Sequence, residues 1–464
     1  MDVRVEAEVW GQVWEQLRHS FNSPAAPEFG VLALVAPSLH PKREALIISD
    51  IVTPDANSFE LQERDRLVFS TGYLRRAVLE AQRRRLPGLM VLHTHPNARH
   101  EVSFSPFDNA DEPELIANLR EFLPGGWFAS VVCGAKSLMG RAWRPGQNIP
   151  SRLDRMFVVG DPWKEINLDG HPLPEPPPPA AMFDRALAVT GAGALARLRR
   201  MRVAIVGVSG TGSLMAELLV RAGVGELLLI DGDAVKKENL NRIAYSRKVD
   251  ADRLRPKVEM LKERLNELDL GTRIEVVPHH LPEADTLDAL RGVDLIFGCV
   301  DKHWPRHLLS RVAIQYVLPL IDLGTEIGDS RGAVDAVNAR VSFVAPGRPC
   351  LVCSGVASQD LITLETLSPE ERTQHLGMGY APNFEMDEPA VMDLNMRAAS
   401  QAMMALRHLL QPFIRDGLPV HFRESVGTTS IKADNGAWSN RCVFCDSGAY
   451  RSTGDWGPPA VVLG

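Results

Sequence analysis

The sequence lacks an excess of basic residues and a long apolar run, and it contains few cysteines. Its 51 Lys and Arg residues stand against 58 Asp and Glu residues, and the resulting net charge of -7 argues against a general nucleic-acid-binding protein. The apolar run at residues 86–92 is too short to span a bilayer and contains Pro87. We therefore expect neither a nucleic acid nor a membrane among the partners of this protein.

The first twenty residues and the cysteines predict a cytoplasmic protein. Residues 1–20 lack a basic region followed by an apolar stretch, which argues against a signal peptide, and their pattern favours an amphipathic helix. Four of the six cysteines lie in two Cys-x-x-Cys pairs. In a reducing compartment such pairs indicate a metal site rather than disulfides.

A proline-rich segment divides the chain. At 464 residues the chain is too long for one hydrophobic core, so two or three domains are expected. The consecutive prolines within residues 171–180 favour a stiff, extended spacer. We therefore predict one domain at residues 1–158, a linker at 159–181 and a second domain at 182–464.

The second domain alternates strands and helices after a helical stretch at residues 182–200. The predicted strands are the apolar runs at 201–207, 225–233, 273–278 and 293–300, and the predicted helices between them are at 213–222 and 258–268. This alternation predicts a doubly wound α/β fold with a Rossmann-like, mainly parallel sheet. Residues 355–390 have little periodicity and are predicted to form a long crossing loop.

A turn with three glycines, Gly207, Gly210 and Gly212, follows the first of these strands. Glycines in such a turn let backbone amides approach phosphate oxygens, and the N-terminus of the next helix favours negative charge. Asp231, at the end of the following strand, is placed to bind ribose hydroxyls. Because Ser209 interrupts a strict G-x-G-x-x-G pattern, these features alone would also suit a nicotinamide-cofactor dehydrogenase.

Charged and amide side chains beyond the turn favour a different reaction. They are Asp231, Asp233, Glu238, Asn239, Arg242, Lys257, Asp301, Lys302 and Arg306. A dehydrogenase needs no such set around its phosphates. Attack of a carboxylate on an α-phosphoryl group does need it, because pyrophosphate leaves with concentrated charge that Lys and Arg neutralise and that Mg²⁺, held by an Asp, balances.

At these residues the sequence resembles the ThiF/MoeB and ubiquitin-activating-enzyme superfamily, over about residues 182–330. The family pattern runs G-x-G-G-x-G, D-x-D, N-L-x-R, Lys and C-x-D-N-x-x-x-R. The resemblance implies ATP and Mg²⁺ as cofactors and assigns the following roles. Asp231 would bind ribose, Asn239, Arg242 and Lys257 would contact the ATP phosphates, and Asp301 would bind Mg²⁺.

The family also places an arginine finger before the first strand, in an R-Y-x-R-Q motif. Arg185 is the candidate, and because this arginine usually acts across a dimer interface, the resemblance implies a homodimer. The sequence departs from the family at Ser209, at Ala186 in place of Gln and at Lys302 in place of Asn. None of these departures removes a charge that the chemistry needs.

The two Cys-x-x-Cys pairs, Cys350 with Cys353 and Cys442 with Cys445, suit a closed tetrahedral structural zinc. The family closes its C-terminal region in the same way. Ubiquitin-activating enzymes carry a further Cys in or near the crossing loop, where it takes the acyl group as a thioester, but residues 354–441 contain none. We therefore predict that the reaction stops at the acyl-adenylate, which an external nucleophile captures, such as a conjugating-enzyme Cys or a sulfur donor.

The first domain carries a second candidate metal site. His93 and His95 occupy alternate positions at the end of an apolar strand, so both imidazoles can reach one metal, and Asp108 follows in Ser105-Pro-Phe-Asp. Two His and one carboxylate, with water in the fourth position, describe a catalytic zinc site. Two ordinary strand histidines are the alternative.

This pattern resembles the JAMM (MPN+) metallopeptidase motif H-x-H-x7-S-x-x-D, although nine residues separate His95 from Ser105. The resemblance covers about residues 20–145 and implies an α+β domain with a catalytic Zn²⁺ held by His93, His95 and Asp108. It further implies Glu28, before an apolar strand, as the general base, and Ser105 as a donor to the oxyanion.

JAMM peptidases cut after the terminal glycine of ubiquitin-like proteins, and the adenylyltransferase uses the free glycine carboxylate. Together the two resemblances imply a bifunctional enzyme that processes and activates such a protein. Three alternatives stay open. They are the activation and processing of a sulfur-carrier protein, a dinucleotide-dependent oxidoreductase, and a silent scaffold that binds a ubiquitin-like protein.

Overall fold

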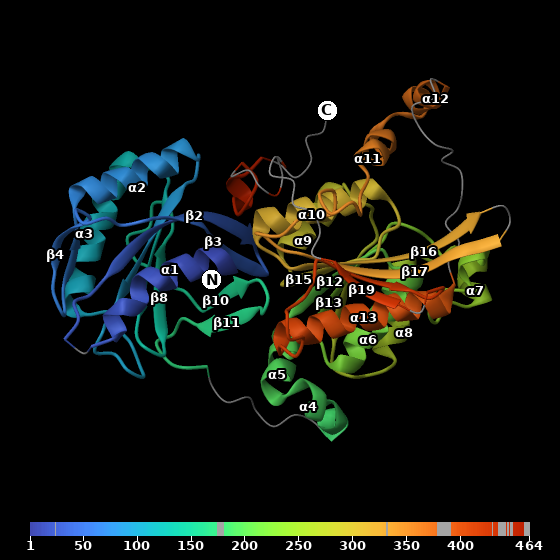
Figure 1. The fold of residues 1–464 in the computed structure, drawn as a ribbon, viewed down its shortest axis with the longest axis horizontal. Coiled ribbons are helices and arrows are strands. Elements are labelled where there is room, and N and C mark those ends of the chain that lie inside the picture. Colours follow the sequence, from blue (N-terminus) through green and yellow to red (C-terminus); the bar gives the residue numbers. More distant parts are fainter. Residues whose placement is uncertain are drawn as a thin grey trace. The chain divides into compact units, whose positions relative to one another are not determined.

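The computed structural model describes residues 1–23, 25–173, 181–330, 333–377, 391–428, 430–434, 442, 445 and 449–458. The chain forms two compact units (Figure 1). Unit 1 comprises residues 1–175, 315–317 and 447–459, and unit 2 comprises residues 176–314, 318–446 and 460–464.

Unit 1 contains a nine-stranded mixed sheet in the order β11-β10-β1-β3-β2-β6-β7-β8-β9. Its strands are β1 (Asp2–Glu6), β2 (Gly30–His40), β3 (Arg43–Val52), β6 (Gly88–Thr94), β7 (Trp127–Cys133), β8 (Leu138–Trp143), β9 (Ser151–Arg152), β10 (Arg155–Val159) and β11 (Lys164–Asn167). A separate hairpin consists of β4 (Phe59–Gln62) and β5 (Leu67–Phe69).

Helices cover both faces of this sheet, because β2 buries apolar side chains on each side. Val31, Ala33 and Val35 pack in the same cluster as helix α1 (Ala7–Leu17). Leu32 and Leu34 point the other way and pack with α2 (Thr71–Arg83) and α3 (Pro106–Phe122). Successive residues of a strand face opposite sides, so one continuous apolar run supplies two cores.

Two predictions for unit 1 were wrong. Residues 1–20 were predicted to form one helix, but Val3 and Val5 alternate into the core and β1 pairs with β3 and β10, so a strand precedes α1. The linker was predicted to begin at residue 159, but β11 pairs with β10 and the Trp163 ring contacts Phe157. The sheet therefore extends past the predicted boundary, and residues 174–180 of the predicted linker lie outside the described residues.

The C-terminal segment at residues 449–458 belongs to unit 1. The short helix η4 (Gly454–Trp456) lies against β2, and Asp455 Oδ2 accepts a hydrogen bond from the Leu39 amide at 2.7 Å. Arg451 Nε donates to Glu6 Oε2 at 2.9 Å. A side chain at position 454 would have its Cβ 2.4 Å from the Pro37 carbonyl oxygen, so this segment needs glycine there.

Unit 2 contains an eight-stranded sheet in the order β14-β13-β12-β15-β16-β17-β18-β19. Its strands are β12 (Arg202–Val206), β13 (Glu226–Ile230), β14 (Arg273–Val277), β15 (Leu295–Gly298), β16 (Leu320–Ser330), β17 (Ala333–Val344), β18 (His421–Ser425) and β19 (Ser430–Asp434). The strands from β14 to β16 are parallel, and the remaining neighbours are antiparallel. The predicted α/β class is confirmed, with a mixed sheet.

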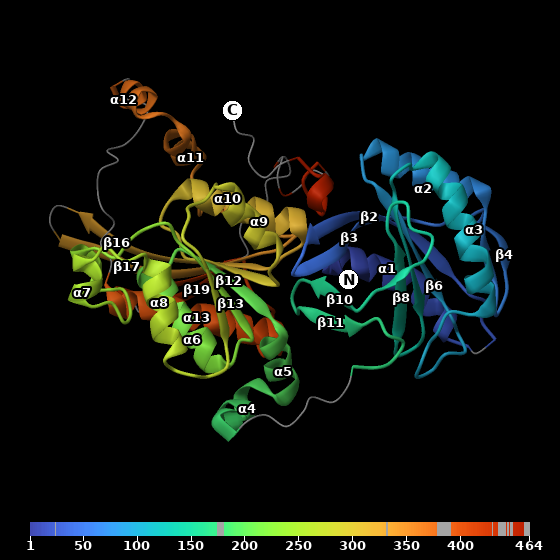
Figure 2. The same ribbon diagram turned by 180° about the vertical axis from the view of Figure 1, so that it is seen from behind.

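Helices lie on both faces of this second sheet, as Figures 1 and 2 show. Helices α9 (Ala284–Arg291) and α10 (His303–Tyr316) lie on one face. Helices α6 (Gly210–Ala222), α8 (Lys257–Asn266) and α13 (Met392–Leu410) lie on the other. No helix in the described part of the chain is long and apolar enough to cross a membrane.

Two further predictions needed correction in unit 2. The helical stretch at 182–200 is interrupted at Gly191, whose φ of 72° separates α4 (Asp184–Thr190) from α5 (Ala192–Arg200). The predicted crossing loop contains two helices, α11 (Gln359–Thr366) and α12 (Pro369–Gly377). These helices are short and amphipathic only weakly, so they left little periodicity in the sequence. Residues 378–390 of the predicted loop lie outside the described residues.

Candidate nucleotide site and candidate metal centres

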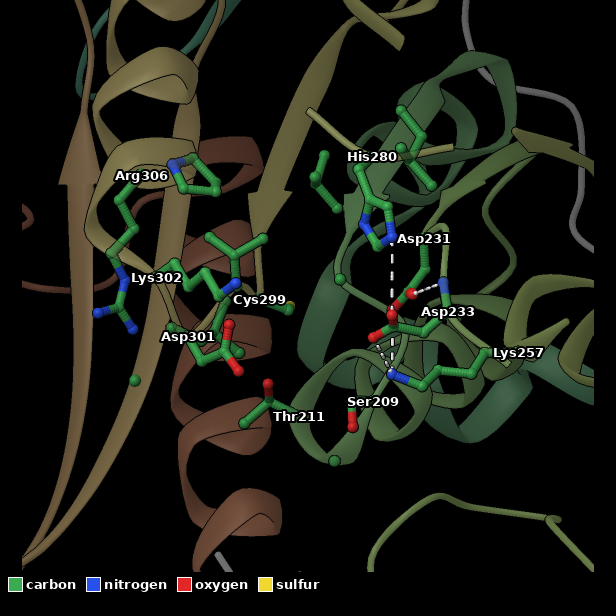
Figure 3. Close-up of a pocket in the computed structure, with 18 of the residues that line it drawn as sticks. Ser209, Thr211, Asp231, Asp233, Lys257, His280, Cys299, Asp301, Lys302 and Arg306 are labelled. Carbon is green, nitrogen blue, oxygen red and sulfur yellow. Dashed lines mark hydrogen bonds and ion pairs between the residues drawn. The ribbon is translucent and has the colours of Figure 1, made fainter. Parts of the chain in front are cut away.

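A cavity of about 1330 Å³ opens at the carboxyl ends of β12, β13 and β15 (Figure 3). The chain runs from β12 through β13 to β14 on one side and then returns to β15 on the other side. Loops on the two sides of β12 therefore diverge, and the crevice between them is the usual ligand site of such sheets. The volume is ample for a nucleotide.

The glycine turn forms the floor of this cavity, lined by Gly207, Ser209, Gly210 and Thr211. Gly207 has a φ of 89°, and a Cβ there would lie 2.5 Å from the Cys299 carbonyl oxygen. Helix α6 begins at Gly210, three residues earlier than predicted, and its first two residues line the cavity. The backbone amides at the start of a helix favour an anion.

Gly212 has a packing role, because a Cβ there would lie 1.9 Å from the Gly207 carbonyl oxygen. Only glycine lets the first turn of α6 approach the end of β12 so closely. Gly212 does not line the cavity, whereas Gly207 and Gly210 do.

Asp231, Asp233 and Lys257 form one wall of the cavity (Figure 3). The two oxygens of Asp231 accept hydrogen bonds from the amides of Val208, at 2.7 Å, and Asp233, at 2.8 Å. Lys257 Nζ donates to Asp233 Oδ2 at 2.8 Å and lies 3.8 Å from Asp231 Oδ2. Burial raises the pKa of Asp231. Burial also acts to raise the pKa of Asp233, but the hydrogen bond from Lys257 holds that pKa below its usual value.

The opposite wall follows β15 and carries Asp301, Lys302 and Arg306 (Figure 3). Asn239 and Arg242, in the segment after β13, also line the cavity. Asn239 Oδ1 accepts a hydrogen bond from the Lys236 amide at 3.0 Å, and Arg242 Nη1 donates to the Glu238 carbonyl at 2.7 Å.

The structure thus brings together the predicted nucleotide residues Gly207, Gly210, Asp231, Asp233, Asn239, Arg242, Lys257 and Asp301 in one cavity. It does not bring Arg185 there. Arg185 is exposed on α4 and is not among the residues that line the cavity.

Several lining residues were missed by sequence reasoning, among them His280, Thr325 and Asn395. His280 follows β14, and its Nε2 lies 3.6 Å from Asp233 Oδ1. Because the carboxyl ends of neighbouring parallel strands share one sheet edge, His280 could have been found from its place after a predicted strand. Thr325 and Asn395 come from β16 and α13, and no local pattern links them to the turn. Thr325 Oγ1 donates to Asn395 Oδ1 at 3.2 Å.

In unit 1, His93, His95 and Asp108 bring their ligand atoms within 4.8 Å of one another. Asp108 Oδ1 lies 3.1 Å from His93 Nε2, and Asp108 Oδ2 lies 3.3 Å from His95 Nε2. Both Nε2 atoms are buried, and neither has a hydrogen-bond partner within the described residues. Ligand atoms of a tetrahedral zinc with N and O ligands lie about 3.3 Å apart, so this donor set fits a zinc ion.

Glu28 stands beside this donor set, with its Oε1 3.5 Å from His95 Nε2. The side chain is buried, and burial raises the pKa of Glu28 to about 7, while His93 acts in the opposite direction. Ser105 caps α3: its amide donates to Asp108 Oδ2 at 2.6 Å, and the Asp108 amide donates to Ser105 Oγ at 3.1 Å. Ser-x-x-Asp is a capping pattern, so Ser105 fixes the orientation of Asp108.

The four cysteines Cys350, Cys353, Cys442 and Cys445 gather their Sγ atoms within 4.8 Å. The Sγ atoms of Cys350 and Cys442 are 3.9 Å apart, and those of Cys353 and Cys445 are 3.6 Å apart. These distances exceed a disulfide bond. They match the sulfur–sulfur separation of about 3.8 Å in a tetrahedral zinc site with Zn–S bonds of about 2.3 Å. The donor set therefore fits a structural zinc.

The two remaining cysteines are buried and free. Burial raises the pKa of the Cys133 thiol to about 12 and also raises that of the Cys299 thiol. A thiolate is the reactive form of cysteine, so neither residue is suited to act as a nucleophile near neutral pH.

Residues 183–409 match the ThiF family. The chain is 26% identical over 184 residues to ubiquitin-like modifier-activating enzyme 5 of Dictyostelium discoideum, covering 35% of this chain and 46% of that protein. It is 30% identical over 171 residues to the Drosophila virilis enzyme of the same name, covering 34% of this chain and 40% of that protein. The chain thus spans less than half the length of these curated relatives.

Among solved structures, the chain is similar to E. coli MccB in complex with MccA-N7isoAsn. That similarity has a TM-score of 0.47 and 16% sequence identity, and it covers 60% of this chain and 77% of MccB. A further similar structure is PaaA, with a TM-score of 0.39 and 18% identity, covering 55% of this chain and 81% of PaaA.

Proposed function

We propose that the ThiF family domain at residues 183–409 adenylates the C-terminal glycine carboxylate of a ubiquitin-like protein. The observation that carries the proposal is the convergence in one cavity of the glycine turn with Asp231, Arg242, Lys257 and Asp301. Cations and acids around an amide-lined floor suit a triphosphate with its Mg²⁺. The partial match to ubiquitin-like modifier-activating enzymes supports the class of substrate.

In the proposed reaction a carboxylate oxygen attacks the α-phosphorus of ATP. The bond from that phosphorus to the α–β bridging oxygen breaks, and pyrophosphate leaves with the electron pair. Asn239, Arg242 and Lys257 would hold the phosphates and offset the developing charge. Asp231 would bind the ribose, and Asp301 would hold the Mg²⁺ that accompanies ATP. Because Arg185 lies outside the cavity of its own chain, we propose that it acts as an arginine finger across a homodimer.

The proposed product is the acyl-adenylate. Residues 354–441 contain no cysteine, and Cys133 and Cys299 are buried with raised thiol pKa values, which supports capture by an external nucleophile. A conjugating-enzyme cysteine and a sulfur donor are the two candidates. The four clustered cysteines would hold a structural Zn²⁺ that fastens the chain after β19 to the segment after β17.

We propose a second activity for unit 1, a JAMM-type peptidase that cuts after the terminal glycine of the same protein. The observation that favours it is the pair of buried Nε2 atoms that face Asp108 and have no hydrogen-bond partner within the described residues, with Glu28 beside them. A zinc ion held by His93, His95 and Asp108 would supply Lewis-acid chemistry at the scissile carbonyl. Glu28 would take a proton from the attacking water and return it to the leaving amine, for which a pKa of about 7 is suited. Ser105 would help to hold the oxyanion.

ATP–pyrophosphate exchange tests the adenylation. We expect exchange in the presence of Mg²⁺ that requires a ubiquitin-like protein ending in glycine. Exchange followed by thiocarboxylate formation with sulfide would favour a sulfur-carrier pathway, and transfer to a conjugating-enzyme cysteine would favour protein conjugation. The absence of exchange with every glycine-ended protein tried would instead point to a scaffold.

A further inference from the structure

A buried cluster of three charged side chains lies behind the Arg306 wall of the nucleotide cavity. Asp322, on β16, is fully buried. Its Oδ2 accepts a hydrogen bond from Arg340 Nη2, on β17, at 2.9 Å. Its Oδ1 lies 3.6 Å from Nε of Arg306, on α10. One carboxylate therefore stands between two guanidinium groups.

The charges in this cluster do not balance. The side chains of Arg306 and Arg340 are only 11% and 12% exposed, so water screens them little. Two positive charges face one negative charge. Arg306 lines the cavity, and its Nε has no hydrogen-bond partner within the described residues. The surplus positive charge is thus presented to whatever occupies the cavity.

The two guanidinium groups meet over Gly324, which lies opposite Arg340 in the β16–β17 register. A Cβ at position 324 would lie 2.6 Å from Arg340 Nη2 and 3.3 Å from Arg306 Nη2. The glycine therefore leaves the space in which the arginines approach each other. Gly324 also lines the cavity.

Arg340 is itself fixed from the side away from the cavity. Its Nη1 donates to Ser342 Oγ, and that oxygen lies 2.8 Å from Nδ1 of the buried His421. Arg340 does not line the cavity. Its guanidinium is therefore held rigidly by two neighbours, and it repels the guanidinium of Arg306 toward the open space.

We propose, on the premise of the adenylation described above, that Arg340 is a positioning residue which, through Asp322, sets Arg306 to bind an oxyanion at the reacting end of the cavity. The oxyanion is the attacking carboxylate or the α-phosphate, two groups that lie together in the acyl-adenylate. Arg340 touches neither of them. A purely structural role for Arg340 would stabilise the fold without affecting what Arg306 binds.

Binding of 5′-O-(N-glycylsulfamoyl)adenosine, a stable analogue of a glycyl-adenylate, separates these roles. We expect R340M to weaken its affinity about tenfold, as for the loss of one hydrogen bond to a charged group. R306M should weaken affinity by at least as much, and R340M should cause no further loss in an R306M background. R340K, which keeps the charge but cannot contact Asp322 and Ser342 together, should fall between wild type and R340M.

Arg202 offers a matched control. It is buried in the same sheet, at the opposite end of β12, and it pairs with Glu226 and Glu275. R202M should lower thermal stability yet leave the affinity for the analogue unchanged. Thermal unfolding of each variant shows whether it is folded, and if R340M fails to fold, R340K carries the comparison.

The positioning role would be overturned if R340M and R340K bound the analogue with wild-type affinity. It would also be overturned if R340M weakened the affinity equally in the wild-type and R306M backgrounds. A wild-type protein that fails to bind the analogue would instead overturn the proposed adenylation. The two failures are therefore distinguishable in one titration series.

Discussion

Glu28 Oε1 lies 3.5 Å from Nε2 of His95, although the two residues are 67 positions apart in the sequence. The pairing of Gly30 with His93 in the β2–β6 register explains this approach. The strand that begins after Glu28 runs beside the strand that ends at the two histidines. The Glu28 carboxylate thereby lies close to the two imidazoles, although no local sequence pattern links it to them.

Replacing Glu28 by Gln should silence cleavage while zinc stays bound. The amide cannot accept the proton of the attacking water, so we expect a loss of about 10²-fold or more in the rate of cleavage after the terminal glycine. Release of the downstream peptide from a ubiquitin-like fusion protein measures the rate. The exposed Glu60, on β4, provides the control E60Q, which should cleave normally. Normal cleavage by E28Q would remove Glu28 from the mechanism.

Replacing His95 by Ala should remove the zinc of unit 1 and spare the zinc of the cysteine cluster. In the proposed site His95 would be one of three protein ligands, whereas the four clustered cysteines of unit 2 would hold a different ion. Elemental analysis of the purified protein should show a loss of about one zinc per chain, because a catalytic zinc site of this kind has only three protein ligands. If the zinc content of unit 1 is unchanged, the ligand assignment is wrong.

Replacing Asp301 by Ala should abolish ATP–pyrophosphate exchange and leave peptide cleavage intact. Asp301 lines the cavity of unit 2, and the residues proposed for cleavage belong to unit 1. Loss of a ligand to the Mg²⁺ that stabilises the leaving pyrophosphate typically raises the activation free energy by several kcal/mol. The rate of exchange should therefore fall by about 10²-fold or more. D252A, at an exposed acid on α7 (Lys248–Asp252), should retain exchange. A joint loss of both activities would mean that the two sites are not separable.

Unit 2 should lose stability between about pH 6.5 and pH 4 because of His307. Burial lowers the pKa of His307 to about 4, whereas the unfolded residue keeps its ordinary value. In this window the unfolded state binds the proton and the folded state does not, so the free energy of unfolding falls as the pH falls, by about 3 kcal/mol at most. Urea unfolding of wild type and H307Q across this range measures the effect. An equally steep loss in H307Q would assign the proton uptake to another group.

Sequence reasoning correctly predicted the strands that can be recognised from an apolar run within one segment of the chain. Residues 201–207 form a nearly continuous apolar run, which is typical of a strand buried on both faces. The strand β12 and its glycine turn follow from it. Two of the wrong predictions, in unit 1, concern strands whose partners lie elsewhere in the chain or follow the predicted boundary. Strands β1 and β11 owe their conformation to pairing with β10 on either side, and that pairing is long-range for β1.

Residues of the candidate sites were likewise found from the sequence where a local motif contains them, and missed where their position depends on strand pairing. Ser105 and Asp108 were found because the Ser-x-x-Asp part of the metallopeptidase motif holds both within four residues. Arg340 carries no local signal, since its position behind Arg306 depends on the antiparallel register of β16 and β17. Sequence periodicity defines which face a strand residue occupies, but it does not define which residue of another strand lies beside it.

Residues 449–458 belong to unit 1 and lie against β2, so the proline run is one of several places where the chain passes between its units. A protease cut within the proline run would therefore open the backbone without freeing the N-terminal fragment. The N-terminal fragment would still be bound by the hydrogen bonds of Arg451 with Glu6 and of Asp455 with the Leu39 amide. The nicked molecule should migrate as one species under native conditions and as two bands only after denaturation.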